Sequence, residues 1–216
     1  TLDTMDAAGL AHVGSYRTQE EWNANHGVVV ADVGGISVAF LGYTYGTNGI
    51  AIPEDRDFCL NRFNTDYTGN CETLDQEGLS QALAYAEGLN TDLIAVMIHW
   101  GIEYQTQQNA YQEEVADFLI AHGADLILFP EVQLTEFFPQ YQGQDVRRYR
   151  LGLESPEVQA FRKASREWNI WASPNVYLEE NGKAYDASLL IGADGQPAPE
   201  RGGDRDGGAP KVFPEN

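Results

Sequence analysis

The sequence has few basic residues, few cysteines and no long apolar run, and each shortage excludes a class of protein. Only 13 Lys and Arg stand against 33 Asp and Glu, which leaves a net charge of -20 over 216 residues. Because so acidic a surface repels phosphate backbones and anionic lipids, we expect neither nucleic acid nor an anionic membrane surface as a partner. No stretch approaches the ~20 apolar residues of a membrane span. No signal peptide stands at Thr1, and a start at Thr suggests processing, trimming or a fragment.

Cys59 and Cys71 are the only cysteines, and eleven residues separate them in a polar loop. This spacing differs from that of a Cys-x-x-Cys metal or redox pair. A disulfide and two free thiols both remain open, depending on the redox compartment. The glycine-rich dinucleotide and P-loop patterns are absent, as are the His-Glu-x-x-His and Gly-x-Ser-x-Gly motifs. The apolar share of 43% is that of a globular protein with one large domain or two small ones.

Residues 92–131 form the most informative stretch. The apolar, β-branched run 93–98 predicts a buried parallel strand that ends at His99. Asn109 opens an amphipathic helix, which Gly123 is expected to stop. Residues 124–129 predict a second strand, followed by Glu131. A right-handed crossover would place His99 and Glu131 at the same carboxyl edge of the sheet, where ligands of open α/β sheets bind.

The flanking segments extend this pattern into an α/β fold, a partial αββα layered sandwich with mixed sheets. Apolar runs on both sides of Gly34-Gly35 predict a hairpin. Helices are predicted over 74–89 and after Ser155-Pro156, with Ser as N-cap and an inner face that includes Trp168. Strands are expected at 170–172, 175–178 and 185–191, the last two joined by an Asn-Gly turn. The Gly, Pro and Asp-rich residues 196–216 predict a flexible tail.

Residues 1–125 resemble the CapA family of capsule and poly-γ-glutamate synthesis proteins, which have a calcineurin-like metallophosphoesterase fold. The resemblance rests on 2–9, on 38–49 and most specifically on the stretch 96–104 around His99-Trp100-Gly101. It implies that His99 is a ligand of a divalent metal such as Mn²⁺ or Zn²⁺. The family's early Asp and His ligands would lie before Thr1, and Phe129-Pro130-Glu131 stands where its later Gly-x-His-x-His block should be.

Residues 124–195 resemble the nitrilase superfamily of carbon–nitrogen hydrolases. The matching stretches are 125–131, 155–170 and 175–195. The resemblance implies that Glu131 is the general base, for which Phe129, Phe137 and Phe138 could form an apolar surround. The family's Lys and Cys are missing: Arg201 and Arg205 stand near the place of the Lys, and no cysteine follows position 71.

Two truncated segments, 1–125 and 124–195, therefore meet near residues 123–127. A natural fusion, an engineered chimera and an assembly error would all produce such a join. The first hypothesis is a CapA-like hydrolase acting on a small molecule or a cell-surface polymer, and the second is a metal-free amidase. The third is a non-catalytic acidic fragment. The first implies an extracytoplasmic location and the second a cytoplasmic one, and the oligomeric state stays open.

Each candidate residue also has a structural interpretation. His99 could be a strand-end histidine hydrogen-bonded to a loop, and Glu131 could serve packing alone. His122 is expected to be structural, at a helix C-terminus that favours a cation. His12 and His26 show no grouping in the sequence and are expected to lie at the surface.

Overall fold

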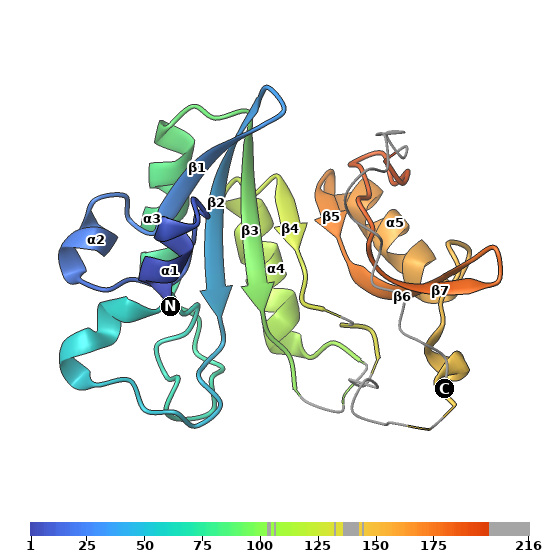
Figure 1. Ribbon diagram of the computed structural model, residues 1–216, viewed down its shortest axis with the longest axis horizontal. Coiled ribbons are helices and arrows are strands. Elements are labelled where there is room, and N and C mark those ends of the chain that lie inside the picture. Colours follow the sequence, from blue (N-terminus) through green and yellow to red (C-terminus); the bar gives the residue numbers. More distant parts are fainter. Residues whose placement is uncertain (103–104, 106, 132, 136–142, 144, 199–216) are drawn as a thin grey trace. The chain divides into compact units, whose positions relative to one another are not determined.

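The computed structural model describes residues 1–102, 105, 107–131, 133–135, 143 and 145–198 (Figure 1). The chain divides into two compact units, one of residues 1–101 and 108–127 and the other of residues 102–107 and 128–216. The larger sheet has the strand order β1-β2-β3-β4-β5, and the boundary between the units falls inside β4 (Leu126–Leu128). Helices flank this mixed sheet, so the predicted α/β class is confirmed.

The first unit begins its sheet with the predicted hairpin. β1 (Val28–Val33) and β2 (Ile36–Thr44) pair antiparallel from Val28↔Leu41 to Val33↔Ile36. Gly34 and Gly35 have φ values of +65° and +90°. A two-residue turn with both φ values positive suits glycine, which carries no Cβ to clash.

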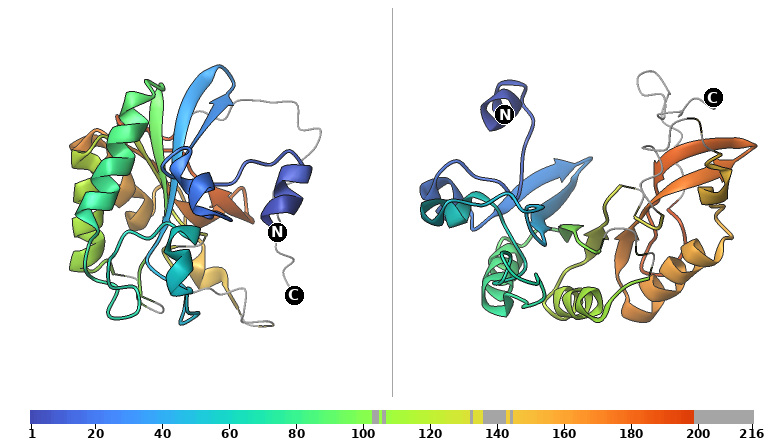
Figure 2. Two further views of the ribbon diagram at one scale, coloured as in Figure 1. Left: turned by 90° about the vertical axis from the view of Figure 1, so that its left-hand side faces the viewer. Right: turned by 90° about the horizontal axis from the view of Figure 1, so that it is seen from below.

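β3 (Leu93–His99) pairs with β2 in parallel, from Val38↔Leu93 to Thr44↔His99. Leu41 and Val96 are almost fully buried and share one face of this pair. The helices α3 (Gln76–Gly88) and α4 (Ala110–Ala121) lie together on one side of the strands, and α1 (Leu2–Ala7) lies on the other (Figure 2). Residues at even positions of β2, including Thr44, therefore lie on the face opposite Leu41.

The strand–helix–strand stretch from β3 to β4 follows the sequence prediction closely. Asn109 caps α4 with a full capping box, in which its side chain and that of Gln112 each accept a backbone N–H. Gly123, with φ +92°, follows the helix end. β4 is shorter than the predicted 124–129, and at its entrance the Asp125 carboxylate accepts the Ile94 N–H at 2.8 Å.

The connecting segments of the first unit include α2 (Gln19–Asn23) and the 3-10 helix η1 (Glu54–Cys59). Gly14 packs directly on Gly42 of β2, so that a Cβ at Gly14 would lie 2.8 Å from the Gly42 carbonyl oxygen. This contact fixes the segment that leads from α1 toward α2.

The described residues of the second unit form a 3-10 helix, one α-helix and three strands. They are η3 (Arg147–Tyr149), α5 (Pro156–Trp168), β5 (Trp171–Ser173), β6 (Asn175–Glu180) and β7 (Lys183–Ser188). The end of β5 lies beside Phe129, whose N–H donates to the Ser173 carbonyl at 3.2 Å. β6 and β7 form the predicted hairpin around Asn181-Gly182.

Three details of the second unit differ from the sequence prediction. Ser155 occupies the N-cap of α5, yet its side chain makes no capping bond. Trp168 is 53% exposed and does not belong to the inner face of α5, because the helix ends there. The last strand ends at Ser188 rather than at residue 191. Residues 199–216 of the predicted tail lie outside the described residues, while the Ala198 N–H donates to the Leu190 carbonyl.

None of the helices in the described part of the chain has the length and apolar character that crossing a membrane requires.

Candidate functional site

His99 is the last residue of β3, and its side chain is exposed at the carboxyl end of the strand. The pairing of β3 with β2 places it beside Thr44 on the face opposite α3 and α4. Alternation of side chains along the strand explains this placement, since Ile98 is buried and Met97 is 44% exposed. The predicted position of His99 at a strand end is confirmed.

Thr44 contacts one of the two ring nitrogens of His99. Its Oγ1 lies 3.0 Å from His99 Nδ1 and 3.0 Å from the carbonyl oxygen of Gly46. A hydroxyl has one proton to donate, and a carbonyl oxygen can only accept. The Thr44 hydroxyl therefore donates to Gly46, and a neutral His99 donates its Nδ1–H to Thr44. Nε2 keeps its lone pair, which can accept a proton, a hydrogen bond or a metal ion.

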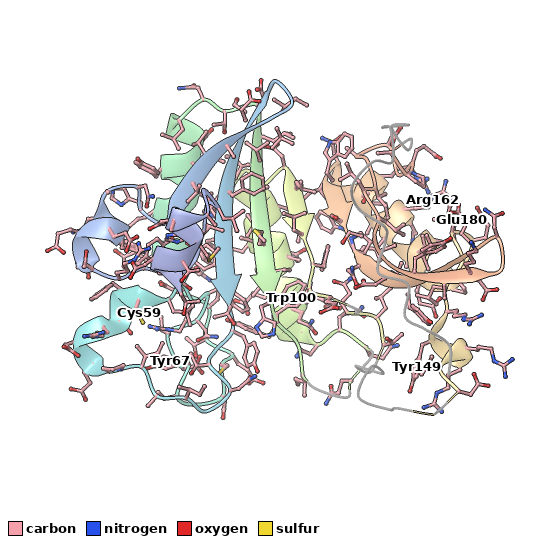
Figure 3. All side chains as sticks on the ribbon, in the orientation of Figure 1. Cys59, Tyr67, Trp100, Tyr149, Arg162 and Glu180 are labelled. Carbon is pink, nitrogen blue, oxygen red and sulfur yellow. The ribbon has the colours of Figure 1, made fainter. Side chains whose placement is uncertain are left out.

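Aromatic side chains surround this end of the sheet. The ring of Tyr45 lies 5.4 Å from that of His99, and the Tyr45 N–H donates to the His99 carbonyl at 2.9 Å. Tyr43 pairs with Ile98 on the helix-covered face, where desolvation by burial raises the pKa of its hydroxyl. Trp100 follows His99 at the end of β3 (Figure 3). Tyr45 thus borders the exposed imidazole, whereas Tyr43 lies half-buried on the helix-covered face.

The other histidines have different surroundings. His122 stacks on Phe118 with ring centroids 3.9 Å apart and contacts its carbonyl, as a structural residue at a helix end would. His26 is exposed and lies beside the ring of Tyr85. The prediction that His12 stands alone at the surface is wrong: its side chain is 14% exposed, and Nε2 lies 3.4 Å from an Asp6 carboxylate oxygen.

The residues around His12 form an ionic cluster that the sequence did not reveal. Arg17 donates to the carboxylates of Asp3, Asp6 and Glu21, and His12 Nε2 also lies 3.9 Å from Glu21. These side chains come from α1, α2 and the segment between them. The cluster ties together the short elements before β1.

Glu131 lies three residues after the end of β4 and belongs to the second unit. Its side chain is exposed. Phe129, part of the predicted apolar surround, packs edge-on against Phe161 with ring centroids 5.2 Å apart, while Phe137 and Phe138 lie outside the described residues. The shared sheet edge of His99 and Glu131, and the base role of Glu131, stay predictions.

Cys59 and Cys71 are free thiols, so the structure selects the second of the two states that the sequence left open. Burial raises the pKa of the Cys71 thiol, as do the nearby carboxylates of Asp66 and Glu72. A thiol with a raised pKa is a poor nucleophile at neutral pH.

The described residues offer a metal ion one imidazole at this edge. Within the described ranges, no group of three or more His, Cys, Asp and Glu side chains is placed to hold a metal. A catalytic zinc site takes three protein ligands and an open position. Of the possible partners of His99 in the sequence, Glu103 lies outside the described residues. The side chains present therefore do not fit a complete metal centre.

Thr44 and Arg62 are the residues of this edge that sequence reasoning missed. Thr44 stands in a stretch rich in Gly, Tyr and Thr that predicted only a loop, and Arg62 stands in a polar loop. The Thr44 N–H donates to Asn61 and the Thr44 carbonyl accepts from Phe63, which makes Arg62 its bridge partner. A signal for Thr44 existed: continuing the second apolar run by two residues would have put Thr44 in the strand beside His99.

Two family models match this chain, and they overlap. The model of the bacterial capsule synthesis protein PGA_cap matches residues 1–129. The model of the carbon-nitrogen hydrolases matches residues 73–203. The overlap runs from just before α3 to just after β4.

Individual proteins also resemble parts of this chain. A capsule biosynthesis protein CapA of Bacillus anthracis is 29% identical over 152 residues, which are 70% of this chain and 35% of that protein. The chain thus spans about a third of the length of this curated relative. A crystal structure of an N-terminal amidase with an Asn-Glu-Ala peptide shares 23% identity at a TM-score of 0.30, covering 34% of this chain and 18% of that one. Another, with an Asn-Glu peptide, shares 22% identity at a TM-score of 0.30, covering 35% and 18%.

Proposed function

Because the chain belongs to the bacterial capsule synthesis protein family over residues 1–129 and to the carbon–nitrogen hydrolase family over residues 73–203, we propose that it serves capsule polymer synthesis as a metallophosphoesterase-related protein. The target would be a phosphoester or a related bond in a small molecule or a cell-surface polymer. His99 would be one ligand of a divalent metal, Mn²⁺ or Zn²⁺. The capsule family comes first because its match contains the whole of the Thr44–His99 arrangement.

The observation that carries this proposal is the hydrogen bond between Thr44 and His99. It holds the exposed imidazole through Nδ1, and when Nδ1 carries the proton, Nε2 keeps a lone pair that can bind a metal ion. Metal-binding histidines are held in the same way, because a hydrogen bond on one nitrogen fixes the tautomer and the direction of the other. The described residues supply one ligand of several, and the further ligands would have to come from residues other than those described.

Nuclear magnetic resonance of the histidine side chains tests the tautomer and the metal together. The expected spectrum of the native chain shows His99 protonated at Nδ1, and small additions of Mn²⁺ should broaden the His99 signals before those of the other histidines. Thr44→Val removes the hydroxyl that accepts the His99 Nδ1–H. Because such a hydrogen bond is worth about 0.5–1.5 kcal/mol, the preference of His99 for the Nδ1-protonated tautomer should fall by up to roughly tenfold. His99→Ala should abolish the selective broadening, whereas the matched variant His122→Ala should retain it.

Metal analysis after dialysis against Zn²⁺ or Mn²⁺ gives the second reading. We expect metal that the native chain and His122→Ala retain and that His99→Ala loses. A His99 protonated at Nε2, or equal metal retention by all three proteins, would sink the proposal. Phosphoesterase activity on a nitrophenyl phosphate is worth measuring only in a chain that passes both tests.

A second candidate is carbon–nitrogen hydrolysis with Glu131 as general base, supported by the match over residues 73–203. Both cysteines of this sequence lie in the first unit, before Glu131 in the chain, and in this candidate the base activates water directly. Removing a general base slows such a reaction about 10²–10⁴-fold. An amide hydrolysis that Glu131→Gln leaves unchanged would exclude this candidate.

A further inference from the structure

Arg62 lies on the same face of the sheet as the Thr44–His99 pair. Residues 61–63 run alongside the end of β2, and Arg62 is the parallel bridge partner of Thr44. Thr44 is in turn the register partner of His99 on its other side. Because paired residues of neighbouring strands point to the same face, Arg62, Thr44 and His99 form one row across the carboxyl edge. Two strand spacings separate the backbones of Arg62 and His99, about 10 Å.

The guanidinium of Arg62 is buried without enough acceptors. Its side chain is only 10% exposed, and its ion-pair partner is Asp57, which Nη2 contacts at 2.5 Å. Nε and Nη1 are both buried and, within the described part of the chain, have no hydrogen-bond partner. Of the five N–H groups of a guanidinium, the three on these two nitrogens therefore lack an acceptor.

Tyr67 does not satisfy these N–H groups. The Arg62 Cζ lies 4.1 Å from the centroid of the Tyr67 ring, so the ring covers the face of the guanidinium. Guanidinium N–H groups point outward in the plane of the group. Stacking therefore stabilises the positive charge and leaves the in-plane donors open. Figure 3 shows Tyr67 in the loop segment next to η1, which supplies Asp57.

Buried N–H groups without an acceptor lower the stability of the folded chain. A buried donor without an acceptor loses the free energy of its hydration, and a charged donor loses more than a neutral one. Arginine is the side chain best suited to bind the oxygens of a phosphate or a carboxylate. The ring of Tyr67 and the carboxylate of Asp57 fix the orientation of the Arg62 guanidinium. Its remaining N–H groups are thereby preorganised to bind such a ligand.

We propose that Arg62 forms an oxyanion-binding site for a phosphate or carboxylate group, in the same row as Thr44 and His99. The site takes the anion on Nε and Nη1, while Asp57 and Tyr67 hold the guanidinium in place. This assignment does not depend on a metal at His99. The positive charge of Arg62 would attract the anion locally, although the chain as a whole has a net charge of -20 and repels anions.

Calorimetric titration with inorganic phosphate, and separately with glutarate as a dicarboxylate, tests the site. We expect saturable binding of at least one of the two by the native chain. Arg62→Gln should weaken it at least tenfold. Arg56→Gln is the matched control, because Arg56 is exposed in η1 and its loss changes the net charge equally, so its dissociation constant should stay within twofold of the native value.

Two further variants keep the test sharp if Arg62→Gln fails to fold. Arg62→Lys retains the charge without the planar fork and should bind at least threefold more weakly. Asp57→Asn weakens the anchor that holds the guanidinium in place and should also weaken anion binding, by less than Arg62→Gln does. The tighter of the two ligands identifies the source of the oxyanion. Absence of saturable binding by the native chain, or equal weakening by Arg56→Gln and Arg62→Gln, would overturn the proposal, whereas loss of metal binding alone would bear only on His99.

Discussion

Gly14 allows the segment after α1 to lie directly against β2, and Gly14→Ala tests this contact most sharply. Its φ is +86°, and a Cβ there would lie 2.8 Å from the Gly42 carbonyl oxygen. The left-handed conformation costs an L-residue roughly 1–2 kcal/mol, and relieving a clash in a packed region costs a further ~1–3 kcal/mol. We therefore expect the free energy of unfolding of the first unit to fall by about 2–5 kcal/mol.

Gly9→Ala is the matched control. Gly9 also has a positive φ, +70°, but a Cβ there would meet no described atom within 4 Å. Only the conformational cost of about 1–2 kcal/mol should appear. Urea unfolding followed by tryptophan fluorescence measures both variants, with equal slopes required for the comparison. If the two variants lose the same stability, the close approach of Gly14 to Gly42 does not exist in solution and the packing argument is refuted.

Three further predictions concern the capping of helices, the core and the pH dependence. Asn109→Ala removes the hydrogen bond from the Gln112 N–H to the Asn109 side chain and should cost about 1 kcal/mol in urea unfolding. Ser155→Ala should cost nothing or stabilise, because the Ser155 hydroxyl is buried and, among the described residues, has no hydrogen-bond partner. Leu83→Ala, at a side chain that is 1% exposed, should cost about 2–5 kcal/mol by calorimetry. Hydrogen bonds from Ser37 lower the pKa of Asp92. The ionised Asp92 side chain therefore contributes to the free energy of unfolding above the unfolded-state pKa of about 4, and this contribution is lost as the pH falls through the lower folded-state pKa. Asp92→Asn should therefore make the free energy of unfolding less dependent on pH in the acid range.

Each of these has a contrary result. Equal costs for Asn109→Ala and Ser155→Ala would mean that the two caps do not differ as the structure shows. A cost below 1 kcal/mol for Leu83→Ala would place that side chain outside the core. An acid unfolding curve identical in Asp92→Asn and the native chain would remove the Ser37 bonds from the account of pH dependence.

The stretch from β3 to β4 was predictable because its signals are local. An apolar run, an Asn at the helix start and a Gly after its end each act within a few residues, and the Asn109 cap and Gly123 occupy the predicted places. Ser155 shows the limit of such signals. The residue type and the following Pro156 give the position of the helix start correctly, but whether the hydroxyl turns toward the backbone depends on packing that the sequence pattern does not contain.

The site was predictable only in part, for a related reason. His99 stands at a strand end that the apolar run reveals, whereas its partner Thr44 lies 55 residues away in sequence. Arg62 joins the row through two backbone bonds from a segment with no periodic pattern. His12 meets Asp6 and Glu21 because short helices fold back on each other. Contacts of this kind are set by chain paths, so residue types alone do not indicate them.

Because side chains alternate between the two faces of β3, the position of His99 along the strand, odd or even, decides which face its imidazole lies on. Met97 and His99 occupy one face and Val96 and Ile98 the other. Deleting one residue within β3 would leave the strand as apolar as before, yet His99 would turn under the helices. Deleting or inserting two residues would restore its face. Only insertions or deletions of an even number of residues in this strand therefore keep His99 on its face. Single substitutions would not reveal this constraint on the evolution of the strand.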